Sequence, residues 1–134
     1  MIYLLDTNAC IRYLNGRAPQ LLRRLEQADP NQIAVCSVVK AELFYGANRS
    51  NKPEATLAAQ LRFLAPYRSL PFNDAAAIVA GEIRAHLASK GTPIGPYDLL
   101  IAAIAVANDC TLITHNVREF GRVPNLHLED WEAS

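Results

Sequence analysis

Three carboxylates in this sequence, Asp6, Glu42 and Asp98, are spaced so that a folded chain can bring them to one site. Each lies next to apolar residues, and each follows a segment that reads as a strand or begins a helix. Carboxylates that share a cleft of low dielectric repel one another unless protons or a cation offset their charge. Oxygen ligands without histidine or cysteine favour Mg²⁺ or Mn²⁺ over zinc. Together the three acids predict a divalent metal site.

Taken one at a time, the same acids have simpler explanations. Asp6 precedes Thr7 and Asn8 and can take part in capping a helix that runs to Leu14. Asp98 in a first helical turn complements the positive end of the helix dipole. Glu42 can form an ordinary ion pair with Lys40 or Arg49. A structural network of ion pairs is therefore the alternative to a metal site.

Short apolar runs bounded by polar residues or proline predict five strands. These are residues 2–5 and the stretches QIAVCSV, YRSLPF, CTLITHN and NLHLED. All five are expected to be buried, and helical patterns lie between them. This alternation predicts an α/β domain with a mainly parallel sheet and helices on both faces. In such a sheet the ligand crevice lies beyond the carboxyl ends of the strands, where the three acids are expected to meet.

Two helical segments stand out. Gly95 and Pro96 predict a helix start, and the following residues, 99–107, are apolar all round, so this helix should be buried in the middle of the domain. The stretch YGANRSNKPEATL joins two helices without a strand and predicts a helical hairpin whose second arm begins at Pro53. Its apolar stripe is expected to be mainly core, with one face available to a partner. The stripe consists of Leu57, Leu61 and Leu64.

The composition sets further bounds. A chain of 134 residues suits one domain, residues 1–134. Thirteen basic and thirteen acidic residues give no net charge, which excludes an overall basic field of the kind found in many nucleic-acid binders. The cysteines are Cys10, Cys36 and Cys110, without a CxxC pair, and predict reduced core thiols and a cytoplasmic protein. We expect no signal peptide and no membrane span.

A series of motifs runs through the chain in order: YLLDTN, SVVKAELFYGA with its Glu42, GTPIGPYDLLIAAIA, LITHNVREFGRVPNL and a final EDW. This series resembles the PIN-domain ribonucleases, and among them the VapC toxins of bacterial toxin–antitoxin systems. The resemblance implies Asp6, Glu42 and Asp98 as metal-binding catalytic residues, with Thr7, Asn8 and Thr114 nearby. Many PIN domains carry a further aspartate where this chain has Asn116, and Glu119 follows three residues later, so the number of metal ions stays open.

The resemblance implies a toxic, Mg²⁺-dependent endoribonuclease in which Mn²⁺ can substitute. It further implies a tRNA substrate, with initiator tRNA in its anticodon region as the most specific form of that expectation. The implied partners are a cognate VapB-type antitoxin that covers the groove by the hairpin, and a second copy of the chain in a homodimer or higher assembly. The alternative is a PIN-like scaffold that binds RNA or protein without cutting it.

Other chemistries fit less well. A haloacid-dehalogenase phosphatase needs a second aspartate two residues after the first, where this chain has Asn8, and no GxGxxG follows the first strand for a dinucleotide. An RNase that uses the 2′-hydroxyl of its substrate as nucleophile would need an acid–base pair, for which His86 and His115 are available. Phosphate contacts need cations, and the candidates are Arg12, Arg49, Lys52, Arg84 and Arg118.

Overall fold

Five parallel strands form a sheet in the order β3-β2-β1-β4-β5 in the computed structural model, which describes residues 1–133. The strands are β1 (Tyr3–Leu5), β2 (Ile33–Cys36), β3 (Arg68–Leu70), β4 (Thr111–Ile113) and β5 (His127–Glu129). The first strand in the sequence is the central one, and Leu4 lies opposite Ala34 on one side and Leu112 on the other. All the carboxyl ends of the strands consequently lie at one edge of the sheet.

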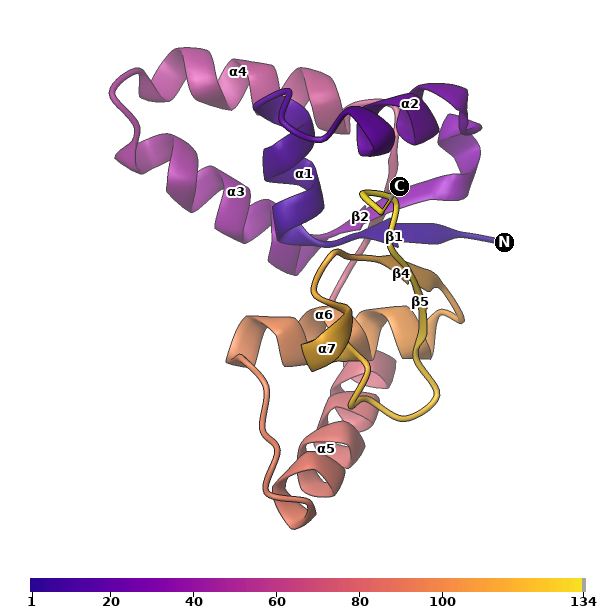
Figure 1. Ribbon diagram of the computed structural model, residues 1–134. Coiled ribbons are helices and arrows are strands. Elements are labelled where there is room, and N and C mark those ends of the chain that lie inside the picture. The colour runs from indigo at the N-terminus through magenta and orange to yellow at the C-terminus, as the bar shows by residue number, and fades with distance from the viewer. Residues whose placement is uncertain (134) are drawn as a thin grey trace.

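Helices cover both faces of this sheet, as predicted. They are α1 (Thr7–Leu14), α2 (Pro19–Gln27), the 3-10 turn η1 (Pro30–Gln32), α3 (Ser37–Arg49), α4 (Pro53–Leu64), α5 (Asp74–Ser89), α6 (Pro96–Ala107) and α7 (Val117–Phe120). In Figure 1, α1 to α4 lie above the strands and α5 to α7 lie below them. This arrangement confirms the α/β class predicted from the alternating pattern.

The prediction of buried strands is right for the inner three and wrong for the outer two. Every residue of β2 and β4 is buried, whereas Arg68 and Ser69 of β3 and His127 of β5 are exposed. The outer strands each have one neighbour in the sheet, and their short sequences carry polar residues that keep the sheet edges in water. Apolar residues within a short run do not reveal whether a strand lies inside a sheet or at its edge.

Helix α6 forms the centre of one layer. Gly95 is its N-cap residue and Pro96 occupies the first helical position, as the sequence predicts. Residues 101–105 have no exposed surface, and α6 packs along α5. The fully apolar pattern therefore corresponds to a helix that is buried on all sides over residues 101–105, with its N-terminal turn open to the edge where the strands end.

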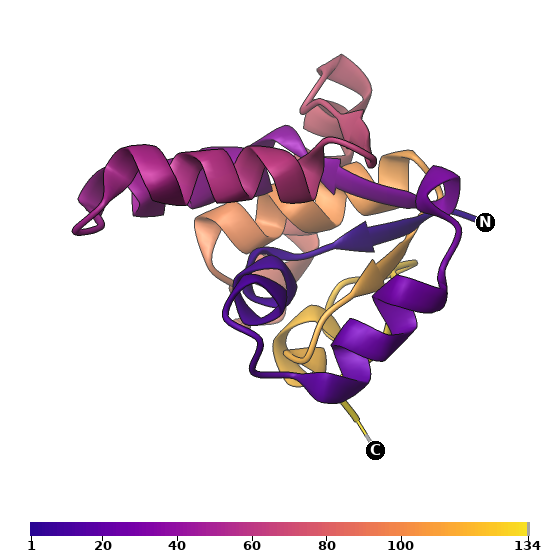
Figure 2. The ribbon, with the colours of Figure 1, turned by 90° about the horizontal axis from the view of Figure 1, so that it is seen from above.

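The helical hairpin is formed by α3 and α4, which run side by side in Figure 1, whereas α4 lies in front of α3 in Figure 2. Pro53 begins α4, as predicted. Gln60 of α4 is buried in the hairpin, and its Nε2 donates a hydrogen bond to the carbonyl of Leu43 at 2.9 Å. The predicted core stripe is only partly correct because Leu61 is 51% exposed, whereas Phe63 and Leu64 turn inward.

The chain ends in a segment that packs back onto α1 and β1. The Trp131 side chain is buried, its ring centroid lies 5.1 Å from that of Tyr3, and the Arg24 guanidinium lies 5.0 Å from its centre. Arg12 of α1 forms an ion pair with Glu132. The three cysteines are buried and free, as predicted. Within residues 1–133, every helix is too short or too polar to cross a lipid bilayer.

Candidate functional site

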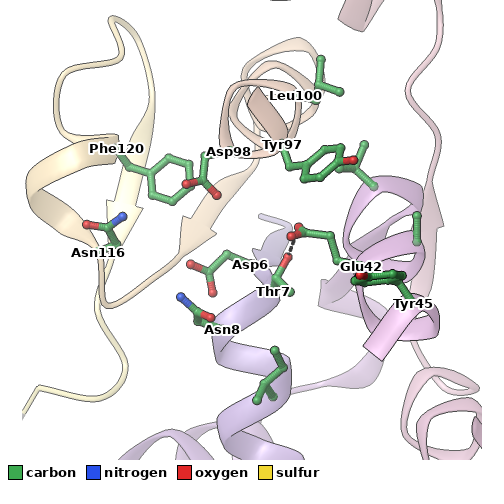
Figure 3. A pocket seen from close by; sticks show the side chains of 13 residues that line it. Asp6, Thr7, Asn8, Glu42, Tyr45, Tyr97, Asp98, Leu100, Asn116 and Phe120 are labelled. Atoms are coloured by element: carbon green, nitrogen blue, oxygen red, sulfur yellow. Dashed lines mark hydrogen bonds between the residues drawn. The ribbon is translucent and has the colours of Figure 1, made fainter. Parts of the chain in front are cut away.

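A cavity of about 790 Å³ lies where the carboxyl ends of β1, β2 and β4 meet the N-terminal turns of α1 and α6 (Figure 3). Its walls come from segments far apart in the sequence. The lining residues are Asp6, Thr7, Asn8, Ile11, Val38, Ala41, Glu42, Tyr45, Tyr97, Asp98, Leu100, Asn116 and Phe120. The three predicted carboxylates thus line one cavity.

Asp6 is the N-cap of α1, and its Oδ1 accepts a hydrogen bond from the Ala9 amide at 2.8 Å. Asp6 therefore does cap α1, but capping alone does not account for the properties of its carboxylate. Burial raises the pKa of Asp6 from 3.8 to about 6, although the Thr114 side chain and the Ala9 amide both act to lower it. The nearby charges of Glu132 and Glu42 raise this pKa further. The cavity thus holds a carboxylate whose charge is poorly compensated.

Glu42 lies in the second turn of α3 and is held by α1. The Thr7 hydroxyl donates a hydrogen bond of 2.6 Å to Glu42 Oε1, drawn as a dashed line in Figure 3. Among the described residues, neither Lys40 nor Arg49 forms the ion pair considered for Glu42. Arg49 instead stacks on Tyr45. Glu42 is therefore oriented by a neutral donor at the cavity, and no basic side chain within residues 1–133 forms an ion pair with it.

Asp98 lies in the first turn of α6 and is half-buried. Burial raises its pKa from 3.8 to about 6, and the charges of Glu119, Asp6 and Glu42 act in the same direction. Its mutual repulsion with Asp6 and Glu42 shows that the three groups share one electrostatic environment. The position in the first turn of α6 suits a carboxylate, and burial nevertheless raises the pKa of Asp98.

Asn116 lines the cavity, whereas Glu119 and Thr114 support it from behind. Asn116 Nδ2 donates to Glu119 Oε2 at 2.9 Å, and Glu119 Oε1 accepts from the Gly95 amide at 2.9 Å. Thr114 Oγ1 accepts from the Asn116 amide at 3.0 Å. The hydrogen bonds from Gly95 and Asn116 lower the pKa of Glu119. Glu119 therefore ties the start of α6 to α7, and of the two residues after β4 it is Asn116 that faces the cavity.

The donor set fits a hydrated Mg²⁺ ion better than a metal enclosed by protein. No three Asp, Glu, His or Cys side chains within residues 1–133 form a ready cage for a cation. Mg²⁺ is usually held by one or two carboxylates and keeps several waters, so it does not need such a cage. A cation here would stabilise the charged forms of Asp6 and Asp98, whose pKa values are raised first by burial and then by the charges of neighbouring acids. Their carboxylates, with Glu42 beside them, are the residues that could hold it.

The structure separates the two histidines proposed as an acid–base pair. His86 lies on the exposed side of α5, away from the cavity lining. His115 Nδ1 lies 2.9 Å from Asp130 Oδ2. His115 also lines a smaller cavity of about 390 Å³, together with Asn8, Arg12, Asn116 and Glu132. Of the five candidate phosphate-binding cations, Arg12 lines this smaller cavity and the others line neither.

Besides apolar lining residues such as Ile11 and Phe120, three residues at the site were not predicted from the sequence. Tyr45 and Tyr97 line the cavity with 63% and 58% of their surface exposed. The signal was present, because Tyr97 directly precedes Asp98 and Tyr45 lies one turn after Glu42. Glu132 raises the pKa of Asp6, although it lies 126 positions away in the sequence. No local pattern identifies it, since the packing of Trp131 brings it there.

Known proteins resemble this chain over nearly its full length. Residues 3–126 match the PIN domain family. The chain is 40% identical to a protein of Salmonella typhimurium named tRNA(fMet)-specific endonuclease VapC, over 96% of this chain and 97% of that one. It is 42% identical to ribonuclease VapC2 of Rickettsia felis, over 98% and 99%.

Solved structures resemble the fold closely. The crystal structure of VapBC2 from Rickettsia felis, bound to a promoter DNA fragment, contains a chain that superposes with a TM-score of 0.91 at 41% identity, covering 98% of this chain and 99% of that one. The DNA-bound VapBC of Salmonella typhimurium gives a TM-score of 0.92 at 38% identity, covering 98% of both chains.

Proposed function

Because this chain belongs to the PIN domain family, with VapC ribonucleases as relatives over nearly its full length, we propose that it is a toxic, Mg²⁺-dependent endoribonuclease of a VapBC-type module. One observation supports this most strongly. Asp6, Glu42 and Asp98 line one cavity, and burial with mutual repulsion raises the pKa of both aspartates to about 6. A scaffold that only binds RNA or protein has no use for such uncompensated acids.

Each polar residue of the cavity has a distinct role in the proposed hydrolysis. Asp6 and Asp98 would hold a divalent cation, and such a cation would supply Lewis-acid chemistry, that is, polarisation of the phosphoryl group and acidification of water. The Thr7 hydroxyl donates to Glu42 Oε1 and so fixes the side chain, and the other oxygen of Glu42 would be available to take a proton from the attacking water. Asn116 holds Glu119 through its amide hydrogen bond and adds an uncharged polar group to the cavity lining.

The substrate and partners are proposed from the relatives. The Salmonella typhimurium relative is named a tRNA(fMet)-specific endonuclease, and we expect this chain to cut initiator tRNA in the anticodon region. The two solved structures described above are VapBC complexes. We therefore expect a VapB-type antitoxin to bind this chain and cover the cavity. In that complex we expect two or more copies of the chain.

The chemistry of the cut ends tests the mechanism. Attack by water with departure of the 3′ oxygen leaves 5′-phosphate and 3′-hydroxyl ends, whereas attack by the RNA 2′-hydroxyl leaves a cyclic phosphate. We expect the first outcome with purified protein and initiator tRNA. Cleavage should stop with EDTA, return with Mg²⁺ or Mn²⁺, and be poorly supported by Ca²⁺, whose looser coordination shell positions water less well.

Variants locate the chemistry. Asp6→Asn keeps a good capping residue and should lose several orders of magnitude in rate. Asp109→Asn is the matched control because it removes one exposed carboxylate outside the cavity, at a positive φ of 52° that asparagine tolerates. Replacing His86 and His115 should leave most of the rate. Cyclic-phosphate ends, or EDTA-resistant cleavage by a nuclease-free preparation, would overturn the mechanism.

A further inference from the structure

The cavity has a second, apolar side that phosphodiester hydrolysis by itself does not require. Tyr45, Tyr97 and Ile11 are large apolar side chains that stay 63%, 58% and 40% exposed while lining it. Figure 3 shows both tyrosine rings beside Glu42, across the cavity from Asn116. Exposed aromatic side chains gathered at a concave site indicate a ligand with a flat apolar face.

The two tyrosines are attached to the same turns as the acids. Tyr97 directly precedes Asp98 in the first turn of α6, and Tyr45 follows Glu42 by one turn of α3. A ligand that rests on these rings is therefore held next to the group that the acids act upon. A cavity of about 790 Å³ is also much larger than a hydrated cation and one phosphate group need.

Arg49 fixes one of the rings and adds positive charge beside it. Its guanidinium carbon lies 5.5 Å from the centre of the Tyr45 ring, and its Nη1 donates to the Tyr45 hydroxyl at 3.1 Å. A ring covered on one side by a guanidinium is restrained, and its other side remains available for stacking. An arginine next to a stacking surface suits a base that is covalently joined to phosphate.

We propose that the apolar side of this cavity binds one unstacked nucleobase next to the scissile phosphodiester, with Tyr45 and Tyr97 as its stacking surfaces. This inference rests on the proposed ribonuclease function and adds a base-binding subsite to it. Proteins that act on single-stranded RNA commonly stack splayed bases on aromatic rings, and stacking tolerates different bases because each has a π face. Tyr45 and Tyr97 position the substrate and take no part in proton transfer.

RNAs that lack a single base test this subsite directly. The substrate is an RNA stem-loop with the anticodon loop of initiator tRNA, prepared with a base or with an abasic site on either side of the mapped cut. Wild-type protein should lose roughly ten- to a hundredfold in kcat/KM when one of these two bases is removed. Tyr45→Ala and Tyr97→Ala should lose a similar factor on the intact RNA, but little more on the abasic RNA.

Conservative and distant variants separate stacking from general damage. Tyr45→Phe and Tyr97→Phe keep the rings and should keep most of kcat/KM. Ile78→Ala is the matched control because Ile78 is a 66% exposed apolar residue of α5 outside the cavity, and it should behave as wild type on every RNA. Far-ultraviolet circular dichroism and thermal unfolding should show that all variants are folded.

The outcomes distinguish this subsite from the ribonuclease activity itself. If wild-type protein cuts neither RNA, the proposed function fails. If it cuts intact and abasic RNA equally well, the activity stands and the base-binding subsite is overturned. The same conclusion follows if the losses from Tyr→Ala and from base removal simply multiply. If Tyr45→Ala and Tyr97→Ala cut RNA normally but bind the antitoxin weakly, the rings belong to a protein interface and the inference is wrong.

Discussion

Asp6 caps a helix and lines the cavity with the same carboxylate. Its Oδ1 accepts from the Ala9 amide, and the group is nevertheless only 4% exposed, with a pKa raised to about 6. A carboxylate that served as a cap alone would be stabilised in its charged form, which lowers a pKa. The raised pKa shows that burial, together with the nearby charges of Glu132 and Glu42, outweighs the stabilisation that capping gives to the charged form.

The raised pKa of Asp6 predicts how the stability of the metal-free protein changes with pH. The folded state binds this proton more tightly than the unfolded state, whose pKa is near 3.8, so stability falls as pH rises from about 4 through about 6. The loss is on the order of 3 kcal/mol. Asp6→Asn cannot ionise and still caps α1. In denaturant unfolding without metal, the free energy of unfolding of Asp6→Asn should increase relative to that of wild type as pH rises from 4 to 7. A constant difference would contradict this prediction.

Asp98→Asn should separate activity from stability. It should abolish RNA cleavage and leave the metal-free protein equally or more stable, because it removes repulsion with Glu119, Asp6 and Glu42. Added Mg²⁺ should raise the melting temperature of wild type more than that of the variant. Full activity of Asp98→Asn, or a collapsed fold without metal, would count against Asp98 as part of the site.

Asn116 and Glu119 form a hydrogen-bonded pair in which the amide and the carboxylate can be exchanged between the two positions by substitution. Asn116→Asp replaces the amide donor 2.9 Å from Glu119 Oε2 with a second carboxylate, and should lower the free energy of unfolding by about 1–3 kcal/mol. Glu119→Gln keeps an oxygen that can accept from Gly95 and supplies an amide that can donate to the new carboxylate at position 116. The double variant should therefore recover much of the stability in denaturant unfolding. Additive losses in the double variant would show that the contact contributes nothing.

The helices were better predicted from the sequence than the strands. The start of α6 follows from Gly95 and Pro96, and the start of α4 from Pro53, because proline fits only certain backbone positions. The apolar runs wrongly predicted that the outer strands are buried. A strand of three residues carries too few side chains to show whether it has a neighbouring strand on both sides. Local spacing also placed Asp6 and Asp98 correctly, whereas the approach of Glu132 depends on contacts between the two ends of the chain.

The α3–α4 hairpin gives a test of partner binding. Leu61 is 51% exposed on α4, so Leu61→Lys should change the free energy of unfolding by no more than about 0.5 kcal/mol. If the antitoxin lies along this hairpin, the same change should weaken its binding, because a helix docked in an apolar groove loses a contact there. Ile78→Lys on α5 serves as the control. Unchanged antitoxin affinity, measured by calorimetry, would remove Leu61 from the interface.

The two ends of the chain stabilise each other through the segment after β5. Trp131 is 4% exposed between Tyr3 of the central strand and Arg24 of α2, and Glu132 pairs with Arg12 of α1. Trp131→Ala should lower the free energy of unfolding by about 3–5 kcal/mol, the usual cost of emptying a buried aromatic site. Denaturant unfolding measures this change. Glu132→Gln should lower the free energy of unfolding by less than Trp131→Ala does. A loss below about 1 kcal/mol in Trp131→Ala would show that the segment is dispensable for the fold.

The position of β1 at the centre of the sheet has a consequence for synthesis on the ribosome. β1 emerges first but pairs on one side with β4, and the cavity needs Asp6 together with Asp98 and Asn116. Roughly 110 residues separate Asp6 from Asn116, which corresponds to about 5–20 seconds of translation. Until then the nascent chain exposes an unpaired edge of its central apolar strand, which invites aggregation. A chain that ends before Asp98 lacks both Asp98 and Asn116 and therefore cannot form this cavity.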